Sequence, residues 1–515
     1  MVKKKKKTSK NRQKLTKGDE NNCIQYSIHS RTDLSSENII NILRYNHYAQ
    51  ILILLTLFGL ILRFYHLEFN SLWLDEGATL DFAQRSIIGI WETTAGGEFN
   101  PPLFYYLEHA MLIVGNSEWV LRFIPALMGT LTIPVVYLIG REYLDECGGL
   151  IAAALVSFSS YHIYYSQEAR AYTLVTFFFS LAFLTYIWAI ENKGRCWWIV
   201  FGILSALAFW SHFYVLIPLA FLYLYALIKL AVKIKDKNVS DNKEEIKNFI
   251  YSVLSFIILS LPLIIVTIGL FFKRTSGEPT FGLSGFNVIT GSLVSLSNSS
   301  EIMAFVFVLL FIAGLIGLCL HSKKEAAGLL LLVVFGTLVL SVMLANIMPW
   351  NPRFIIILLP LFFVGMSCSL YWIPKSLNRF HVSVVLVLLL FLLTIPFIST
   401  YYSGFSKNDW RGFSELITDT TVPDDVIVLV PDYMKLPFDY YYSNASDQTI
   451  LSGANNGSEL AKTLEITGNG STAYYAVTWD IMAQNPEGDA VRWLQDNTQY
   501  VGKYTGIDLF AKRGD

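Results

Sequence analysis

Tyr65-His66-Leu67-Glu68-Phe69-Asn70-Ser71-Leu72-Trp73-Leu74-Asp75-Glu76 is the stretch that decides how this chain is organised. It directly follows the first long apolar segment, so the adjacent carboxylates of Asp75 and Glu76 come where a membrane helix ends and an aqueous loop begins. Ionisable groups at a membrane boundary are costly to desolvate and are often functional. The alternative is an interfacial loop that is merely acidic, and the rest of the chain decides between these two interpretations.

The composition is that of a polytopic membrane protein. Of the 515 residues, 53% are hydrophobic and 15% are charged, whereas soluble globular proteins carry roughly 25% charged residues. The mean hydropathy is +0.45. The net charge of −1 includes a basic run from Lys3 to Lys7, which indicates a cytoplasmic tail ahead of a membrane helix rather than a nucleic-acid-binding segment. Because the polar tail continues to about Tyr48, no cleavable signal peptide is expected.

Eleven segments are apolar enough to span a bilayer, which takes about 20 residues. We expect spans near 48–67, 119–140, 147–165, 171–190, 197–211, 213–232, 249–271, 301–320, 326–346, 353–373 and 382–400. The apolar segment 103–114 is excluded because it is short and contains Glu108 and His109. Without it, the Lys-rich loop 229–247 falls on the cytoplasmic side, as the positive-inside rule requires. We therefore expect 103–114 to be an interfacial or re-entrant helix.

The fold class that follows is mainly α, a polytopic membrane protein with about 11 transmembrane helices and a small extracytoplasmic α/β domain. Residues 1–47 form a basic, disordered cytoplasmic tail, and residues 48–400 form the transmembrane domain, whose first external loop covers 68–118. In the external domain, 401–515, we expect helices at 409–417, 458–463 and 489–495 and strands at 426–430, 449–451, 473–478 and 507–511. No nucleotide-binding fingerprint occurs in this domain.

This topology gathers carboxylates and arginines on the external face. A carboxylate such as Asp75 can accept the proton of a hydroxyl nucleophile as its bond to a sugar carbon forms. Arginines give bidentate hydrogen bonds to a phosphate leaving group, and Arg122, Arg170 and Arg353 all lie at external ends of predicted spans, with Glu168 beside Arg170. A lipid carrier of the phosphate would explain why such a site lies at the membrane surface.

These residues also have purely structural interpretations. Arg122 and Arg353 can snorkel to the interface, and Glu168 and Arg170 can pair with each other. The second acidic pair, Asp145-Glu146, faces the cytoplasm in this topology and is excluded. No spaced His, Cys and Asp cluster indicates a metal site, so no cofactor is predicted, and a divalent ion between Asp75 and Glu168 is not indicated.

The motifs, in their order, resemble the C-type membrane glycosyltransferases, in the branch related to dolichyl-phosphate-mannose–protein mannosyltransferases and the lipid A aminoarabinose transferase. The resemblance covers residues 48–190 well and the remaining spans loosely. It rests on Leu62-Arg63-Phe64-Tyr65-His66-Leu67, Ser71-Leu72-Trp73-Leu74-Asp75-Glu76, Asn100-Pro101-Pro102-Leu103-Phe104-Tyr105-Tyr106, Arg122-Phe123-Ile124-Pro125-Ala126, Tyr165-Ser166-Gln167-Glu168-Ala169-Arg170-Ala171-Tyr172 and Asn408-Asp409-Trp410-Arg411-Gly412.

The resemblance implies a lipid-phosphate-sugar donor, inversion at the sugar carbon, and Asp75 as the catalytic base with Glu76 beside it. The substrate-binding residues are then Arg170, Glu168, Arg353, Arg122, Asn100 and Tyr65. Asn100 departs from the family pattern, since relatives commonly carry a charged residue or His before the Pro-Pro pair. The MIR-type insertion of the eukaryotic protein mannosyltransferases is also absent from this sequence.

We therefore predict a multi-pass cell-membrane glycosyltransferase with a cytoplasmic N-terminus. It moves a hexose, mannose being one candidate, from a polyprenyl- or dolichyl-phosphate carrier to a lipid, glycan or protein acceptor on the outer face. Its other partners are membrane lipids, and no nucleic acid is expected. The alternative is a transporter or flippase for a lipid-linked or polar solute. Transporters commonly show internal repeats and interrupted helices, and neither is visible in this sequence.

Overall fold

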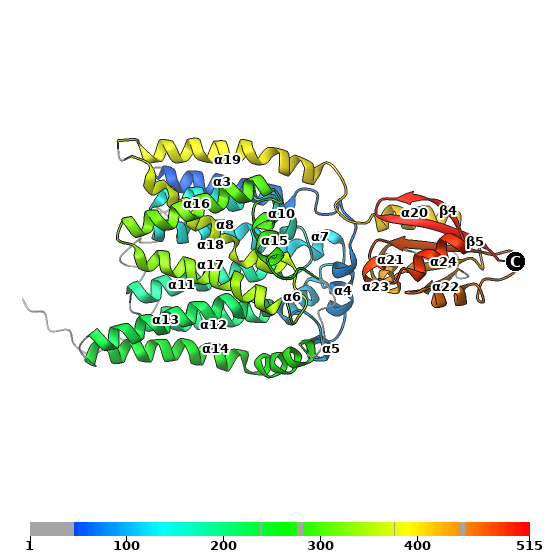
Figure 1. Cartoon of the computed structure of the whole chain (residues 1–515), viewed down its shortest axis with the longest axis horizontal. Coiled ribbons are helices and arrows are strands. Elements are labelled where there is room, and N and C mark those ends of the chain that lie inside the picture. The colour runs from blue at the N-terminus through cyan, green and yellow to red at the C-terminus, as the bar shows by residue number, and fades with distance from the viewer. Residues whose placement is uncertain are drawn as a thin grey trace, which may run out of the picture. The chain divides into compact units, whose positions relative to one another are not determined.

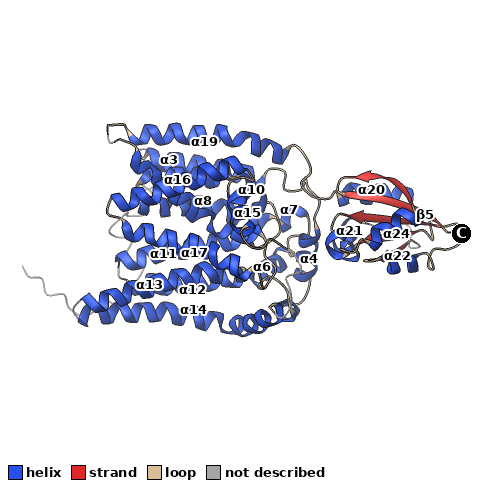
Figure 2. Cartoon of the chain, in the orientation of Figure 1, coloured by secondary structure: helices blue, strands red, loops and turns tan. Residues whose placement is uncertain are grey.

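The structure is a computed structural model that describes residues 46–192, 194–236, 239–275, 282–374, 376–442 and 449–514. The predicted basic tail, residues 1–47, therefore lies almost entirely outside the described residues. A bundle of long helices extends to the end of α19 (Arg379–Tyr402), and a small sheet with its own helices follows it in the chain (Figures 1 and 2).

Nine helical segments of the described ranges are long and apolar enough to cross a membrane. They lie in α3 (His47–Phe64), α7 with α8 (Glu118–Leu121 and Phe123–Tyr143), α11 (Tyr172–Asn192), η1 with α13 (Phe213–Val215 and Leu216–Asp236), α14 (Val239–Arg274), α16 (Glu301–Leu320), α17 (Lys324–Leu344), η2 with α18 and η3 (Pro352–Leu358, Leu359–Ser367 and Cys368–Trp372) and α19 (Arg379–Tyr402). A tenth is formed by α9 (Glu146–Phe158) and α10 (Ser160–Ser166), which meet at a 60° bend. The shorter α12 (Arg195–Ser211) is also apolar. Nine or ten of the eleven predicted spans therefore correspond to helices long and apolar enough to cross, whereas the predicted span 197–211 corresponds to the shorter α12.

The bend between α9 and α10 positions the loop that follows them. Ser159 has an extended backbone, and its hydroxyl accepts a hydrogen bond from the His162 N–H, so it ends one helix and caps the next. Below the bend, α8 and α9 approach closely, because a Cβ on Gly140 would lie 3.0 Å from the Cα of Gly149. Small residues commonly allow such close packing between membrane helices. α10 leads directly into residues 167–171, which lie beside α4, because the Ala169 N–H donates to Glu76 Oε1 at 2.8 Å.

Three short helices lie between α3 and α7: α4 (Leu74–Ala83), α5 (Ile87–Gly96) and α6 (Leu103–Met111). The nine residues of α6 are only about 14 Å long at 1.5 Å per residue, less than half of the hydrocarbon thickness. Just beyond α6, Ile113 and Val114 are 89% and 72% exposed. These features agree with the prediction that 103–114 does not span the membrane.

The C-terminal sheet has five strands in the order β2-β1-β3-β5-β4. β1 (Val426–Val430) is the second strand in this order, with β2 (Ile450–Gly453) and β3 (Thr472–Thr478) parallel to it on either side. β5 (Ile507–Arg513) is antiparallel to β3, and β4 (Gln499–Tyr504) pairs with β5 at the edge.

Helices cover both faces of this sheet, so every residue of β1 is buried. One face packs against α20 (Trp410–Thr420) and α21 (Lys435–Tyr441) through side chains that include Phe413 and Phe438. The opposite face packs against α22 (Gly457–Thr463), α23 (Ile481–Gln484) and α24 (Asp489–Asn497). Buried strands of this kind read as continuous apolar runs, which is why β1 is visible in the sequence as Val-Ile-Val-Leu-Val.

Candidate functional site

Asp75 and Glu76 lie in the first turn of α4, where the partial positive charge of a helix N-terminus favours carboxylates. Glu76 is the third residue of the helix, and its Oε2 accepts a hydrogen bond at 3.4 Å from the backbone N–H of Trp73, the N-cap residue. The local sequence therefore turns the two carboxylates in different directions, and the rest of the fold gives them different surroundings.

Glu76 is fully buried and surrounded by donors. Its oxygens accept hydrogen bonds from Arg122 Nε at 2.8 Å and Arg122 Nη2 at 2.7 Å, from the Ala169 N–H at 2.8 Å and from Lys407 Nζ at 3.0 Å. Burial alone would raise the pKa of this carboxyl, but the charges of Arg122 and Lys407 together with these hydrogen bonds lower it to about 2. Glu76 is thus a carboxylate whose hydrogen-bonding capacity is taken up inside the protein.

Arg122 is likewise committed to the protein itself. Its Nε and one Nη2 hydrogen reach Glu76, and its remaining donors reach the carbonyl oxygens of Leu67, Asn70 and Ser71. A guanidinium has five N–H donors, so every donor of Arg122 is used. Its side chain ties the loop 67–71 to α4 and is 1% exposed as a residue, which is the opposite of snorkelling.

Asp75, in contrast, is partly open to solvent, with 20% of its side chain exposed. Its Oδ2 accepts a hydrogen bond from Arg353 Nη1 at 2.8 Å and lies 3.8 Å from Arg170 Nε. Arg170 Nη1 also donates to the Asp75 carbonyl oxygen and to the Thr79 hydroxyl, at 3.3 and 3.4 Å. Arg353 Nε is buried and has no hydrogen-bond partner among the described residues. One accessible carboxylate therefore lies beside two guanidinium groups, one of which has an unused donor.

Glu168 is the third carboxylate of the site. It is fully buried, and neither of its carboxyl oxygens has a hydrogen-bond partner in the described part of the chain. Lys407 Nζ lies 3.7 Å from Glu168 Oε2. Burial raises the pKa of Glu168 to about 7, with Lys407 opposing the shift and the charges of Glu76 and Asp75 adding to it. Glu168 does not pair with Arg170 through its side chain; instead, its backbone carbonyl accepts from the Arg170 N–H at 2.7 Å.

Lys407 is a site residue that sequence reasoning missed. It lies in the linker between α19 and α20, its side chain is 6% exposed, and its ammonium group connects Glu76 to Glu168. The rings of Trp73 and Tyr164 lie 5.7 and 5.8 Å from Nζ, within cation–π range. The only signal in the sequence is its position directly before the motif Asn408-Asp409-Trp410-Arg411-Gly412.

Asn100 and Tyr65 have their described contacts elsewhere. Asn100 Nδ2 and the Tyr105 hydroxyl both donate to Glu98 Oε1, at 3.2 and 2.8 Å. Tyr65 is 51% exposed and stacks on His66 with a centroid separation of 3.9 Å. Neither Asn100 nor Tyr65 has a hydrogen bond to Asp75 or its two arginines among the described residues, so the structure does not join them to that cluster.

The described residues contain no group of three or more His, Cys, Asp or Glu side chains arranged to hold a metal ion. His212, near the two arginines of the site, is 3% exposed, and its Nδ1 accepts a hydrogen bond from the Tyr214 N–H at 3.2 Å. Burial, followed by the charges of Arg170, Arg353 and Arg274, lowers the pKa of His212 to about 3. This imidazole is therefore neutral and packs as a structural residue in the turn between α12 and α13.

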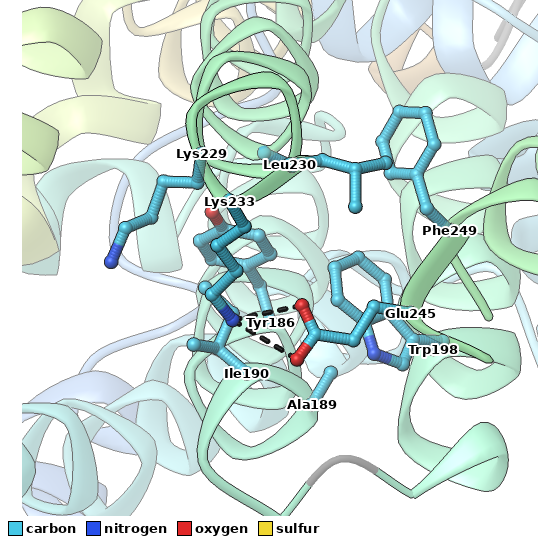
Figure 3. A pocket seen from close by; sticks show the side chains of 10 residues that line it. Tyr186, Ala189, Ile190, Trp198, Lys229, Leu230, Lys233, Glu245 and Phe249 are labelled. Atoms are coloured by element: carbon cyan, nitrogen blue, oxygen red, sulfur yellow. Dashed lines mark hydrogen bonds and ion pairs between the residues drawn. The ribbon is translucent and has the colours of Figure 1, made fainter. Parts of the chain in front are cut away.

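A separate pocket lies between α11, α12, α13 and α14. Its lining includes Tyr186, Trp198 and Lys229, and Lys233 Nζ reaches both carboxyl oxygens of Glu245 at 2.8 and 3.1 Å (Figure 3). Tyr186 is fourteen residues along α11 from Tyr172, which is about 21 Å at 1.5 Å per residue. The pocket is therefore near the opposite end of these helices from Asp75 and is separate from the carboxylate site.

The family model of the dolichyl-phosphate-mannose-protein mannosyltransferases matches residues 100–265 of this chain. No curated protein matches this chain. The match to the family model includes Arg122, Glu168 and Arg170 and agrees with the resemblance seen in the motifs.

The fold is similar to two kinds of solved membrane glycosyltransferase. ArnT from Cupriavidus metallidurans in the apo state matches with a TM-score of 0.55 at 13% identity, over 89% of this chain and 97% of that one. The same protein bound to undecaprenyl phosphate matches with a TM-score of 0.51, at the same identity and coverage. The Archaeoglobus fulgidus oligosaccharyltransferase tethered to an acceptor peptide gives 0.52 at 14% identity, over 91% and 74%. The C-type resemblance and the predicted polytopic fold are confirmed.

Proposed function

We propose that this chain, a membrane protein with the C-type glycosyltransferase fold, transfers a sugar from a lipid-phosphate carrier to an acceptor on the outer face of the membrane. The observation that carries the proposal is the accessible Asp75 carboxylate with Arg353 at 2.8 Å and Arg170 at 3.8 Å. A base and two phosphate-binding groups side by side at the end of a helical bundle suit a reaction between a lipid phosphate ester and a hydroxyl group.

In the proposed reaction, Asp75 is the general base. The acceptor oxygen attacks the anomeric carbon of the donor sugar, its proton passes to the Asp75 carboxylate, and the bond from that carbon to the phosphate oxygen breaks. The lipid phosphate leaves with the bonding electron pair, and the configuration at the carbon is inverted. Positioned base catalysis of this kind contributes roughly 10²- to 10⁴-fold to a rate.

Arg353 and Arg170 are the proposed phosphate ligands. Both carry positive charge next to the position where the leaving group develops negative charge, and Arg353 has an unpartnered Nε donor. Preorganised cations aimed at developing charge are among the largest contributions to catalysis. Arg122 has no donor left for a phosphate, so its proposed contribution is to position the loop 67–71 and Glu76.

The two remaining carboxyl groups have different proposed roles. Glu76, which is saturated with hydrogen bonds, positions α4 and thereby Asp75. Glu168 has the Lys407 ammonium 3.7 Å away but no hydrogen-bond partner for either oxygen among the described residues, so its proposed role is to accept hydrogen bonds from hydroxyls of the donor sugar. Asn100 and Tyr65 are proposed to make only peripheral substrate contacts, because their described contacts lie outside this cluster.

The nature of the donor is proposed by analogy with the similar folds. One of them was solved with undecaprenyl phosphate, and the matching family model is described by dolichyl-phosphate-mannose. We therefore propose a polyprenyl- or dolichyl-phosphate hexose as the donor, with mannose as the first sugar to test. The positive-inside rule, applied to the basic loops, supports the proposal that the carboxylate end of the bundle faces outward.

The test is transfer of radiolabelled sugar from a panel of polyprenyl- and dolichyl-phosphate hexoses by membranes that contain the full chain. Asp75→Asn removes the proposed base and is expected to abolish transfer. The matched control is Asp81→Asn on the same helix, whose carboxylate pairs with Arg85 at 2.6 Å in an exposed position; it should keep transfer. Equal transfer by wild type and Asp75→Asn rejects the base assignment. Solute uptake without transfer from any donor supports the transporter alternative.

A further inference from the structure

The C-terminal sheet has a topological switch point at one edge. Because β1, β2 and β3 are parallel, their carboxyl ends lie on the same edge. After β1 the chain continues into α21, on the face that also carries α20, and after β3 it continues into α23 and α24 on the opposite face. The connections from two neighbouring strands thus diverge, and open α/β sheets bind their ligands at such points.

The side chains at this switch point have an unusual combination of exposure and charge. Trp479, directly after β3, is 71% exposed, and the next residue, Asp480, accepts a hydrogen bond from the Thr478 hydroxyl at 3.0 Å. Across the divergence, Asp432 and Tyr433 follow β1. β1 and β3 pair as far as Val430 and Val477, so the two strand ends are neighbours; burial and then the charges of Asp480 and Asp432 raise the pKa of the Tyr433 phenol to about 12. An exposed indole and a carboxyl group thus follow one strand, and a carboxyl group and a phenol follow the strand paired with it.

This edge adjoins the proposed catalytic base. A Cβ on Gly77 would lie 3.0 Å from the backbone nitrogen of Pro437, so α21 and α4 are in backbone contact two residues beyond Asp75. The pKa of Asp480 is raised by burial, and the charge of Asp75 adds to the shift. α4, which carries Asp75, therefore packs directly against the helix that follows β1 at this edge.

We propose that the carboxyl edge of the C-terminal sheet binds the acceptor and that this acceptor is a carbohydrate. The flat apolar face of an indole packs against the C–H face of a sugar ring, and carboxylates and a phenol form hydrogen bonds with sugar hydroxyls. A peptide would instead pair with the free backbone of an edge strand, and this sheet has its edge strands, β2 and β4, at its sides. The inference rests on the proposed glycosyl transfer for the fate of the acceptor, but binding is measurable separately.

The test is direct binding to the full-length protein in detergent, measured by isothermal titration calorimetry. The probes are the neutral oligosaccharides mannotetraose and N-acetylchitotetraose and a decapeptide rich in Ser and Thr. Wild type is expected to bind at least one oligosaccharide, and Trp479→Ala to weaken that binding about tenfold or more, as loss of a central aromatic contact does. Trp479→Phe should retain most of the affinity. The matched control is Tyr500→Ala on β4, an aromatic residue of comparable exposure at 51%, which should bind as wild type does.

Three outcomes would overturn the inference: no oligosaccharide binding by wild type, equal binding by Trp479→Ala, or Trp479-dependent binding of the peptide alone. Trp479-dependent oligosaccharide binding by a chain that transfers no sugar from any donor rejects the proposed function and leaves this inference standing. Sugar transfer by a chain whose oligosaccharide binding does not depend on Trp479 supports the proposed function and rejects this inference.

Discussion

Arg353 Nη1 donates a hydrogen bond to Asp75 Oδ2 at 2.8 Å, although 278 residues separate the two in the chain. The contact joins the start of α4 to the start of η2 (Pro352–Leu358), and Asn351 caps η2 by accepting a hydrogen bond from the Arg353 N–H. Since Asp75 and Arg353 are each only partly buried, with 20% of both side chains exposed, this pair is open to exchange of partners. In the proposed reaction, the donor phosphate takes the Arg353 donors, and Asp75 becomes free to accept a proton.

Arg353→Lys should lower kcat for sugar transfer by roughly tenfold to a hundredfold, while Arg353→Gln should lower it further. Lysine keeps the charge but gives up the planar pair of donors that matches a phosphate, and glutamine gives up the charge as well. The measurement is steady-state transfer with the donor varied. Similar kcat values for the lysine and wild-type proteins would contradict a bidentate role for this guanidinium.

Lys407→Met should lower the melting temperature strongly in detergent micelles. It takes from the buried Glu168 carboxyl the cation at 3.7 Å, while Glu76 keeps Arg122, and removing one partner of a buried ion pair costs roughly 3–5 kcal/mol. Adding Glu168→Gln to Lys407→Met removes the carboxyl that has lost its cation and should recover part of the loss. If the double variant is as unstable as the sum of the single variants, Lys407 and Glu168 are not coupled.

Glu168→Gln should change how stability depends on pH. The pKa of Glu168 is raised to about 7 in the folded protein, so the protonated form is favoured there. The contribution of Glu168 to the free energy of unfolding is fully present below the pKa of the unfolded chain, near 4.5, and is lost as the pH rises through 7. Relative to Glu168→Gln, wild type should therefore lose stability between about pH 5 and pH 8. Melting curves of both proteins over that range test this, and parallel curves would contradict it.

Glu76 should show the opposite pH dependence. Its pKa is lowered to about 2, so its contribution is present above the unfolded value and is lost as the pH falls through 2. A shift of this size corresponds to about 3 kcal/mol. Glu76→Gln should therefore be destabilised at neutral pH and lose less than wild type on acidification. Melting temperatures at pH 7 and pH 3 give the comparison, with the exposed Asp81→Asn as the control.

The spans and most of the C-terminal sheet with its helices could be predicted, because their buried residues form local apolar patterns in the sequence. The run from Val426 to Val430 is apolar at every position, and β1 occupies those same residues. β4, at Gln499–Tyr504, could not be predicted because it is a largely exposed edge strand interrupted by a register shift between Tyr500 and Gly502. It forms through pairing with β5, which no local pattern reports.

The sequence could also place Asp75, Arg170 and Arg353 on one face, since each follows or precedes an apolar span. It could not distinguish an arginine with free donors from one that is saturated, because that depends on the carbonyl groups that the fold presents to Arg122. For the same reason, the sequence could not separate the partly exposed Asp75 from the buried Glu76 next to it. Lys407 lies in a linker without periodicity, so only the fold brings it to the carboxylates.

The position of Lys407 limits how this protein can be divided or recombined. Its ammonium group completes the site of the helical bundle, yet it is encoded in the segment that leads to the soluble layer. Arg411, four residues further on, forms an ion pair with Glu118 and donates to the Glu68 carbonyl oxygen. A hybrid joined after Gly412 therefore inherits both cations from the parent that supplies the helices, whereas one joined at residue 403 takes them from the other parent. Exchange of soluble layers between related proteins should succeed only at the later junction.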